Sequence, residues 1–254
     1  MKHSTFRKSS LISSVALLLV AIVALSGATF AWFSTASLAT ATGINATTTQ
    51  GSNLTISDAK DTGFTQDLVL TGDDVQKEMS PVTTDNLSTW WTAKAEKYNS
   101  QKAYGGYTED KSGENYIKKT IYVKYDAADG NTHNLKLNVA PAVKTVQIDE
   151  ENTKAIGTLN YYRVAVAPSG ANDQDITTID TYTTKYFANN ITAQYPDGYQ
   201  HAQYTAQQFG EIEIGTINAN DVYAFDVYVW FEGEDIDCKD TDAVNDIDLV
   251  LEFK

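Results

Sequence analysis

Short stretches in which apolar and polar residues alternate run through this sequence and constrain its fold more than any other feature. They lie at residues 53–59, 67–73, 121–125, 135–139, 162–166, 212–214 and 247–253. A period of two residues is typical of a β-strand with one buried face. Residues 223–231 carry large apolar side chains on both faces, with Tyr228 and Trp230 opposite the alternating set. This stretch predicts a central strand that is covered on both sides.

Many short strands joined by polar turns predict an all-β fold, either a sandwich or a barrel. Asp129-Gly130-Asn131 lies between the stretches at 121–125 and 135–139, and it suits a hairpin turn that needs a positive φ.

Residues 85–102 interrupt the alternation. Trp91, Ala95 and Tyr98 have the i, i+4, i+7 spacing of one helical face, and Asp85 or the following Asn supplies a helix cap. We therefore expect a short helix appended to the β domain in this region.

The N-terminal 31 residues have the order of a secretory signal, which we expect to be helical. Three basic residues are followed by the apolar run Leu11–Leu25, then by Gly27, and Ala31 is a small residue suited to position −1. We expect a signal peptidase to cut between Ala31 and Trp32. The alternative is an uncleaved membrane anchor, because residues 11–33 carry no charge and are long enough to span a bilayer. Either interpretation places the remaining chain outside the cytoplasm.

The exported part is strongly acidic. Residues 1–31 contain three basic residues and no acidic one, so the remainder has 16 Lys and Arg against 33 Asp and Glu, a net charge of −17. Such a surface repels nucleic acid and anionic lipid, so we expect no nucleic-acid partner and no membrane contact except through an uncleaved signal. Cys238 is the only cysteine, which excludes an intramolecular disulfide.

No catalytic constellation is evident in the sequence. Outside the signal, His133 and His201 are the only histidines, and no H-E-x-x-H, G-x-S-x-G or phosphate-binding glycine motif occurs. We therefore expect a protein that is not an enzyme and that carries no cofactor. Tyrosines in "AYGGY" and "YPDGYQHAQY" could stack on sugars, although core packing, loop anchoring or subunit contacts explain them equally well.

The acidic stretch at residues 232–248 is a weak candidate for calcium binding, because oxygen-rich loops suit that ion. It lacks the glycine and the closing glutamate of an EF-hand, so we favour a solvated loop between two strands. The candidate ligands are Glu234, Asp235, Asp237, Asp240 and Asp242.

The cleavage region carries a family resemblance. "GATFAWFSTAS", with Gly27, Thr29, Phe30, Ala31 and Trp32-Phe33-Ser34, resembles the TasA/camelysin-like family of exported proteins with a SipW-dependent signal peptide. The stretches at 227–238 and 246–253 also resemble closing strands of proteins with this signal. The resemblance covers about a fifth of the chain. The protease activity attributed to camelysin is not carried over, because the metal-ligand residues that it needs are missing.

The resemblance implies a TasA-like jelly-roll β-sandwich whose subunits polymerise by donating an N-terminal strand. Residues 32–48 occupy the donor position, and the expected assembly residues are Trp32, Phe33, Leu38 and Ile44. This uncharged segment cannot form a core alone, so it lies on its own subunit, hangs free or joins another subunit's sheet. We expect the sandwich, with its helical insertion, to span residues 49–254.

These features together predict a secreted structural subunit of an extracellular fibre or biofilm matrix, located in that matrix or at the cell surface. The expected partners are further copies in a filament, a SipW-type signal peptidase and possible sibling matrix proteins. The alternative function is a cell-surface adhesin or carbohydrate-binding module built on the same sandwich.

Overall fold

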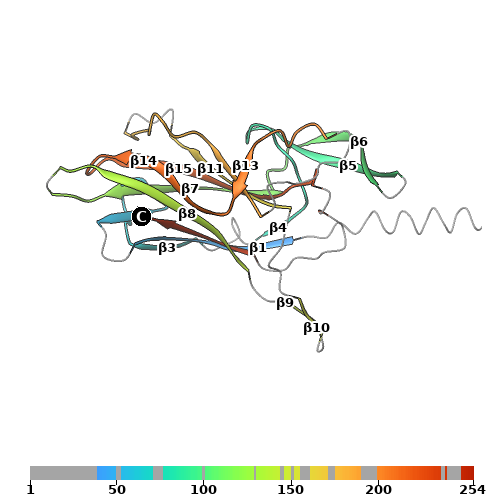
Figure 1. Cartoon of the computed structure of the whole chain (residues 1–254), viewed down its shortest axis with the longest axis horizontal. Helices are drawn as coiled ribbons and strands as arrows, with labels where there is room; N and C mark the ends of the chain where they lie inside the picture. Colours follow the sequence, from blue (N-terminus) through green and yellow to red (C-terminus); the bar gives the residue numbers. More distant parts are fainter. Residues whose placement is uncertain are drawn as a thin grey trace, which may run out of the picture. The chain divides into compact units, whose positions relative to one another are not determined.

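A computed structural model describes most of the chain after residue 38. The described residues are 39–49, 53–70, 77–98, 101–128, 130–143, 146–149, 152–154, 161–170, 175–189, 199–235, 238 and 247–254. In this part of the chain every regular element is a β-strand, which confirms the all-β prediction (Figure 1). None of these residues lies in a helix with the length and hydropathy needed to cross a membrane. The expected signal helix and cleavage site lie outside the described residues.

Twelve of the strands form two six-stranded sheets. Sheet A has the order β14 (Gly210–Ile217), β8 (His133–Val143), β16 (Ile247–Phe253), β1 (Ala39–Thr48) and β3 (Asp67–Leu70), with β4 (Lys77–Met79) also paired to β1. Sheet B has the order β13 (Ala206–Gln208), β12 (Lys185–Ala188), β11 (Tyr162–Pro168), β15 (Val222–Phe231), β7 (Tyr116–Tyr125) and β2 (Leu54–Ser57). Two separate hairpins are β5 (Trp90–Tyr98) with β6 (Gln101–Asp110), and β9 (Val146–Asp149) with β10 (Asn152–Lys154).

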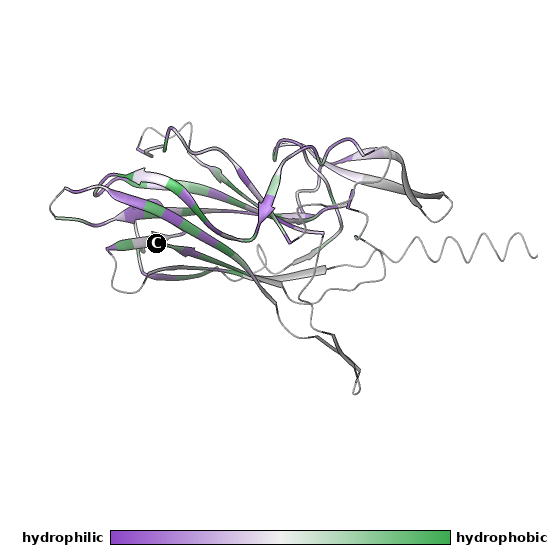
Figure 2. Ribbon diagram, in the orientation of Figure 1, coloured by the Kyte–Doolittle hydropathy of each residue, from purple (hydrophilic) through white to green (hydrophobic). Residues whose placement is uncertain are grey.

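The inward faces of both sheets share one hydrophobic core, as in a β-sandwich. The alternation predicted from the sequence is visible along the strands in Figure 2. Sheet A contributes Ile44, Leu135, Leu137, Val139, Leu249, Leu251 and Phe253, and sheet B contributes Ile117, Ile121, Val123, Val164, Val166, Val227 and Val229. Burial of these branched side chains from both sheets is the main stabilising contribution in a chain without a disulfide.

Strand β15 is central, as its sequence predicts. It lies between β11 and β7 in sheet B, and Val227 on its inner face has no exposed surface. Tyr228 and Trp230 on the opposite face pack with Val82 and Trp90 in a second, smaller hydrophobic cluster. Sheet B is therefore covered on both faces at the end that carries Tyr228 and Trp230.

The helix expected at residues 85–102 is wrong, because residues 90–98 form strand β5, paired antiparallel with β6. The register shifts between Ala93 and Ala95. Such a bulge interrupts the period of two and produced the apparent helical spacing. Asn86 does cap backbone groups, since its Oδ1 accepts from the N–H of Ser88 at 2.9 Å and of Thr89 at 2.8 Å, but these bonds close a turn instead of starting a helix.

The connection at residues 126–132 is also different from the prediction. Gly130 has the expected positive φ of 70°. However, β7 belongs to sheet B and β8 to sheet A, so the connection crosses between the sheets and does not form a hairpin. Alternation identifies each strand but carries no information about which strand it pairs with.

Candidate functional site

Strand β1 occupies an interior position in sheet A. It pairs in parallel with β16, from Ala41 opposite Ile247 to Thr48 opposite Phe253. Its other edge pairs antiparallel with β3 and β4. Every other strand pair in sheet A, among the described residues, is antiparallel. The strand nearest the start of the described chain is thus inserted beside the strand nearest its end.

The composition of β1 suits this position. Ile44 and Ala46 face the core with exposures of 1% and 0%, while Asn45 and Thr47 are half-buried between them. A strand without charge or proline can pair on both edges. Removing β1 would leave open ladder edges on both neighbouring strands and a gap in the core.

The predicted donor segment is only partly described. Its residues 39–48, including Ile44, form β1 in sheet A of their own chain, which is one of the three placements considered for the segment. Ala31, Trp32, Phe33 and Leu38 lie outside the described residues.

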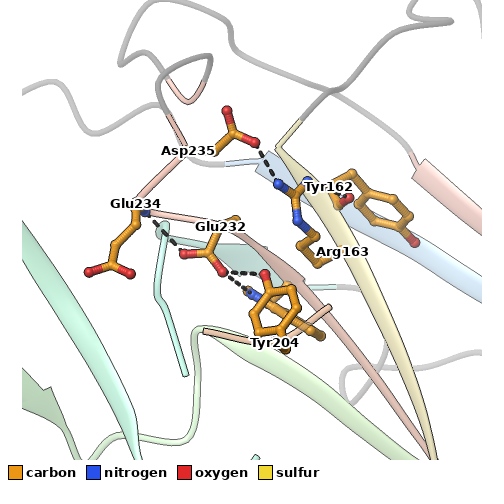
Figure 3. A network of polar contacts seen from close by, with 7 residues as sticks. Tyr162, Arg163, Tyr204, Glu232, Glu234 and Asp235 are labelled. Carbon is orange, nitrogen blue, oxygen red and sulfur yellow. Dashed lines mark hydrogen bonds and ion pairs between the residues drawn. The ribbon is translucent and has the colours of Figure 1, made fainter. Parts of the chain in front are cut away.

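A second notable feature is a group of four buried charged residues, Arg163, Glu232, Glu234 and Asp235, called here the carboxylate cluster (Figure 3). Each is at most 1% exposed. Arg163 comes from β11, and the three acidic residues follow directly after β15. Burial of this many charges requires that each be paired or hydrogen-bonded.

Glu234 connects three segments of the chain. Its carboxylate accepts hydrogen bonds from the backbone N–H of Gln200 at 2.7 Å, His201 at 3.0 Å and Ala202 at 2.6 Å. The hydroxyl of Thr83 donates to it at 3.3 Å, and the hydroxyl of Tyr107 in β6 donates as well. Burial and this carboxylate raise the pKa of Tyr107 above its ordinary value. The loop at 199–204 and the β5–β6 hairpin are thereby held against the end of sheet B.

Glu232 has fewer compensating partners. Its Oε2 accepts from the hydroxyl of Tyr204 at 2.6 Å and from the indole Nε1 of Trp230 at 3.2 Å. Its Oε1 accepts from the N–H of Glu234 at 3.1 Å. Burial raises the pKa of Glu232 above the ordinary value of 4.5, although Arg163 and these hydrogen bonds oppose the shift.

Arg163 and Asp235 form a buried ion pair. The Nη2 of Arg163 lies 2.6 Å from Oδ2 of Asp235, and Nη1 donates to the carbonyl of Tyr162 at 3.2 Å. Removing one partner of such a pair leaves an uncompensated charge, which typically costs about 3–5 kcal/mol.

The carboxylate cluster bears on the calcium hypothesis. The carboxylates of Glu234 and Asp235 accept hydrogen bonds from inside the protein instead of projecting into the acidic loop. Asp237, Asp240 and Asp242 lie outside the described residues, and within the described part no group of acidic, His or Cys side chains could hold a metal ion. The hydrogen bonds and the ion pair of the carboxylate cluster hold the neighbouring loops in place.

The sequence analysis missed this cluster because E-G-E-D after a strand has the composition of a solvated turn.

The two tyrosine-rich stretches meet beside this cluster. His201 stacks on Trp91 with centroids 4.7 Å apart, and Tyr107 meets the same imidazole edge-on at 4.7 Å. Tyr204 stacks on Tyr186 at 4.4 Å. Because these rings pack on one another, we interpret them as anchors of the loops that carry them.

No protein-family model matches the chain, and no curated protein matches it.

Proposed function

We propose that this protein is a secreted structural subunit of an extracellular fibre or biofilm matrix, and that its copies are joined by exchange of β1. The observation that carries the proposal is the insertion of β1, an uncharged strand close to the predicted export signal, into the interior of sheet A in parallel with β16. The same position can be filled by β1 of a neighbouring copy with identical hydrogen bonds and core contacts. The TasA-like resemblance of the signal region points to the same function.

Exchange in one direction produces a polymer. Each copy gives β1 to the next copy and receives β1 from the previous one, a heterologous contact that yields an open filament. Cleavage after Ala31 by a SipW-type peptidase would release the segment from the membrane and allow exchange. N-terminal sequencing of the secreted protein tests this step, with Trp32 as the expected first residue.

A disulfide that fastens β1 to β3 tests the exchange directly. Asn45 and Val69 are directly opposite in an antiparallel pair, and Val69 is 62% exposed. Such pairs have Cα atoms about 4.5–5.5 Å apart, within the range for a disulfide. The variant Asn45→Cys/Val69→Cys, made with Cys238→Ser so that no other thiol remains, holds β1 in its own chain when oxidised and releases it when reduced.

We expect the oxidised variant to remain free of filaments and the reduced variant to form them, as seen by sedimentation and negative-stain imaging. Each single-cysteine variant is the matched control and should form filaments under both conditions. Equal filament formation before and after reduction would contradict exchange of β1. Absence of filaments from the unmodified mature protein under all conditions would contradict the fibre function and favour the adhesin alternative.

A further inference from the structure

Strand β3 lies at an edge of sheet A, and no further strand among the described residues pairs with its outer side. The N–H of Thr48 donates to the carbonyl of Gln66 at 2.8 Å, so these two residues are a hydrogen-bonded pair of the β1–β3 ladder. Bonded and non-bonded pairs alternate along an antiparallel ladder. Asp67 and Val69 fall in the non-bonded pairs, so their N–H and C=O groups face away from β1.

The other sheet edges in the described part of the chain are blunted or partly paired. Strand β14, at the opposite edge of sheet A, carries Glu211 and Glu213 and has a register shift after them. In sheet B, Ile56 of β2 exchanges backbone hydrogen bonds of 2.7 and 2.9 Å with Thr65, and β4 and β13 are each three residues long. Charged side chains, bulges and short strands are the means by which native edges avoid pairing. Strand β3 has no lysine, no proline and no register shift.

The side chains of β3 suit pairing with a strand that is mostly apolar. Val69 is 62% exposed, and Leu68 packs partly buried against the core. Asp67 is the one charged residue of the strand. Its carbonyl accepts from the hydroxyl of Thr65 at 2.7 Å, and a carbonyl oxygen has a second lone pair with which to accept again. The outer side of β3 therefore offers donors and acceptors at both Asp67 and Val69.

We propose that β3 of one copy pairs antiparallel with β3 of a second copy, about a two-fold axis at Leu68. Asp67 then lies opposite Val69 of the second copy on each side of the axis, and these residues exchange up to about four backbone hydrogen bonds. The two carboxylates are not opposite each other, which avoids the repulsion of like charges in a directly facing pair. Pairing with β14 would instead set Asp67 against Glu211 or Glu213, so a second β3 is the better partner.

This contact goes beyond the proposed function and does not require exchange of β1. A two-fold contact uses the same surface on both copies and closes at a dimer, so by itself it produces no filament. Where β1 is exchanged as well, the contact joins filaments in pairs. Small interfaces are typical of weak, transient complexes, and for so short a strand we expect a dissociation constant of about 100 μM.

The contact is tested with β1 held in its own chain. Asn45 and Val250 are neighbours in the parallel β1–β16 ladder, where strands lie about 4.8 Å apart, within the Cα range of a disulfide. The oxidised parent protein, Asn45→Cys/Val250→Cys with Cys238→Ser, therefore blocks exchange and leaves β3 unchanged. Sedimentation velocity from about 1 μM to about 1 mM then measures dimer formation.

Substitutions in β3 test the hydrogen bonds and the register separately. Val69→Pro removes one outward N–H from each copy, and proline is tolerated where the N–H of an edge strand faces solvent. Loss of about two of the four bonds should weaken dimerisation at least about fivefold. Val69→Asp places a carboxylate opposite Asp67 of the second copy and should weaken dimerisation at least about threefold. Adding Asp67→Lys to Val69→Asp turns this repulsion into attraction and should restore the dimer.

Ala140→Asp is the matched control for Val69→Asp. Ala140 lies opposite Val250 in the same row across sheet A, but on β8 instead of the edge strand. The substitution adds the same charge to the same face of the sheet. Because Ala140 takes no part in the β3 contact, the dissociation constant should stay within about twofold of the parent's.

A parent that stays monomeric at about 1 mM, or that forms species larger than a dimer, would overturn the two-fold contact. Dimerisation of Val69→Pro or Val69→Asp equal to the parent's, failure of Asp67→Lys to restore it, or an equal loss in Ala140→Asp would also overturn it. The urea midpoint reports whether each variant is folded, and if Val69→Pro unfolds, Val69→Asp and its restored double variant decide. Filament formation by the reduced protein is a separate measurement that bears on the proposed function alone.

Discussion

Replacing Glu234 by Gln tests whether this buried carboxylate holds the end of sheet B together. The substitution keeps the shape of the side chain but converts one acceptor oxygen into an NH₂ donor. Oε1 accepts from the N–H groups of Gln200 and His201, and Oε2 from those of His201 and Ala202. Whichever way the amide is turned, its NH₂ therefore faces two backbone donors at a site without exposed surface.

The expected loss of stability follows from the donor that loses its acceptor. The N–H of His201 bonds both oxygens and keeps the remaining one, so either the N–H of Gln200 or that of Ala202 is left unpaired. An orphaned buried hydrogen-bonding group costs about 1–3 kcal/mol, and we expect the free energy of unfolding to fall by that amount. This is a large fraction of the 5–15 kcal/mol that is typical of a folded domain. Urea unfolding followed by tryptophan fluorescence measures the change as a lower midpoint at constant m-value.

Glu232→Gln is the matched control for this substitution. Glu232 accepts from one backbone N–H, a rotatable tyrosine hydroxyl and one indole, and its ionised form is disfavoured by burial. We expect Glu232→Gln to lower the free energy of unfolding at neutral pH less than Glu234→Gln does. A Glu234→Gln protein within about 0.5 kcal/mol of wild type, the usual range for surface substitutions, would refute the role assigned to the Glu234 carboxylate.

Three further predictions concern the pH dependence of the Glu232 contribution, the burial of Val227 in β15, and the backbone at Gly170. Because the folded-state pKa of Glu232 is raised above 4.5, its contribution to the free energy of unfolding is complete below about pH 4.5 and is lost as the pH rises through the raised pKa. The stability of Glu232→Gln relative to wild type should therefore increase as the pH rises from about 4.5 through that pKa. A difference in urea midpoint that does not change with pH would contradict this. Val227→Asp should prevent folding because it buries an unpaired charge, and a cooperatively melting soluble variant would show that β15 is not central. Gly170 has a φ of +85°, and an added Cβ would lie 2.8 Å from Ile176, so Gly170→Ala should cost more than Gly113→Ala, where φ is +71° and the space is open. The strain common to both is about 1–2 kcal/mol, and equal melting temperatures would show that the contact with Ile176 yields freely.

The strands were predictable because their signal is local. Alternation located strands within β2, β3, β7, β8, β11, β14, β15 and β16, and the double-sided pattern of 223–231 identified the central strand. Pairing was not predictable in the same way, since it depends on contacts between distant residues. The bulge at 93–95 shows a further limit, because one extra residue changes the period and makes a strand resemble a helix.

The carboxylate cluster was hidden for a different reason. Glu232, Glu234 and Asp235 have the composition of a solvated loop, and their burial becomes apparent only when the loop at 199–204 and Arg163 are placed around them. The one local indication was the apolar run from Val227 to Phe231 at the end of β15, which places the following residues at the end of a buried strand. The position of β1 beside β16 likewise involves residues about two hundred positions apart.

The pairing of β1 with β16 also has a consequence for the order of folding. During synthesis β1 can form its antiparallel ladder with β3 and β4 early, because these strands follow within a few tens of residues. Its other edge cannot pair with β16 until the chain has been extended by about two hundred further residues. Pairing between strands so far apart in the sequence is slow compared with local pairing. The nascent chain therefore presents an unpaired β1 edge until β16 has been made, and pulsed hydrogen exchange should show amides of the β1–β3 ladder protected before those of β16.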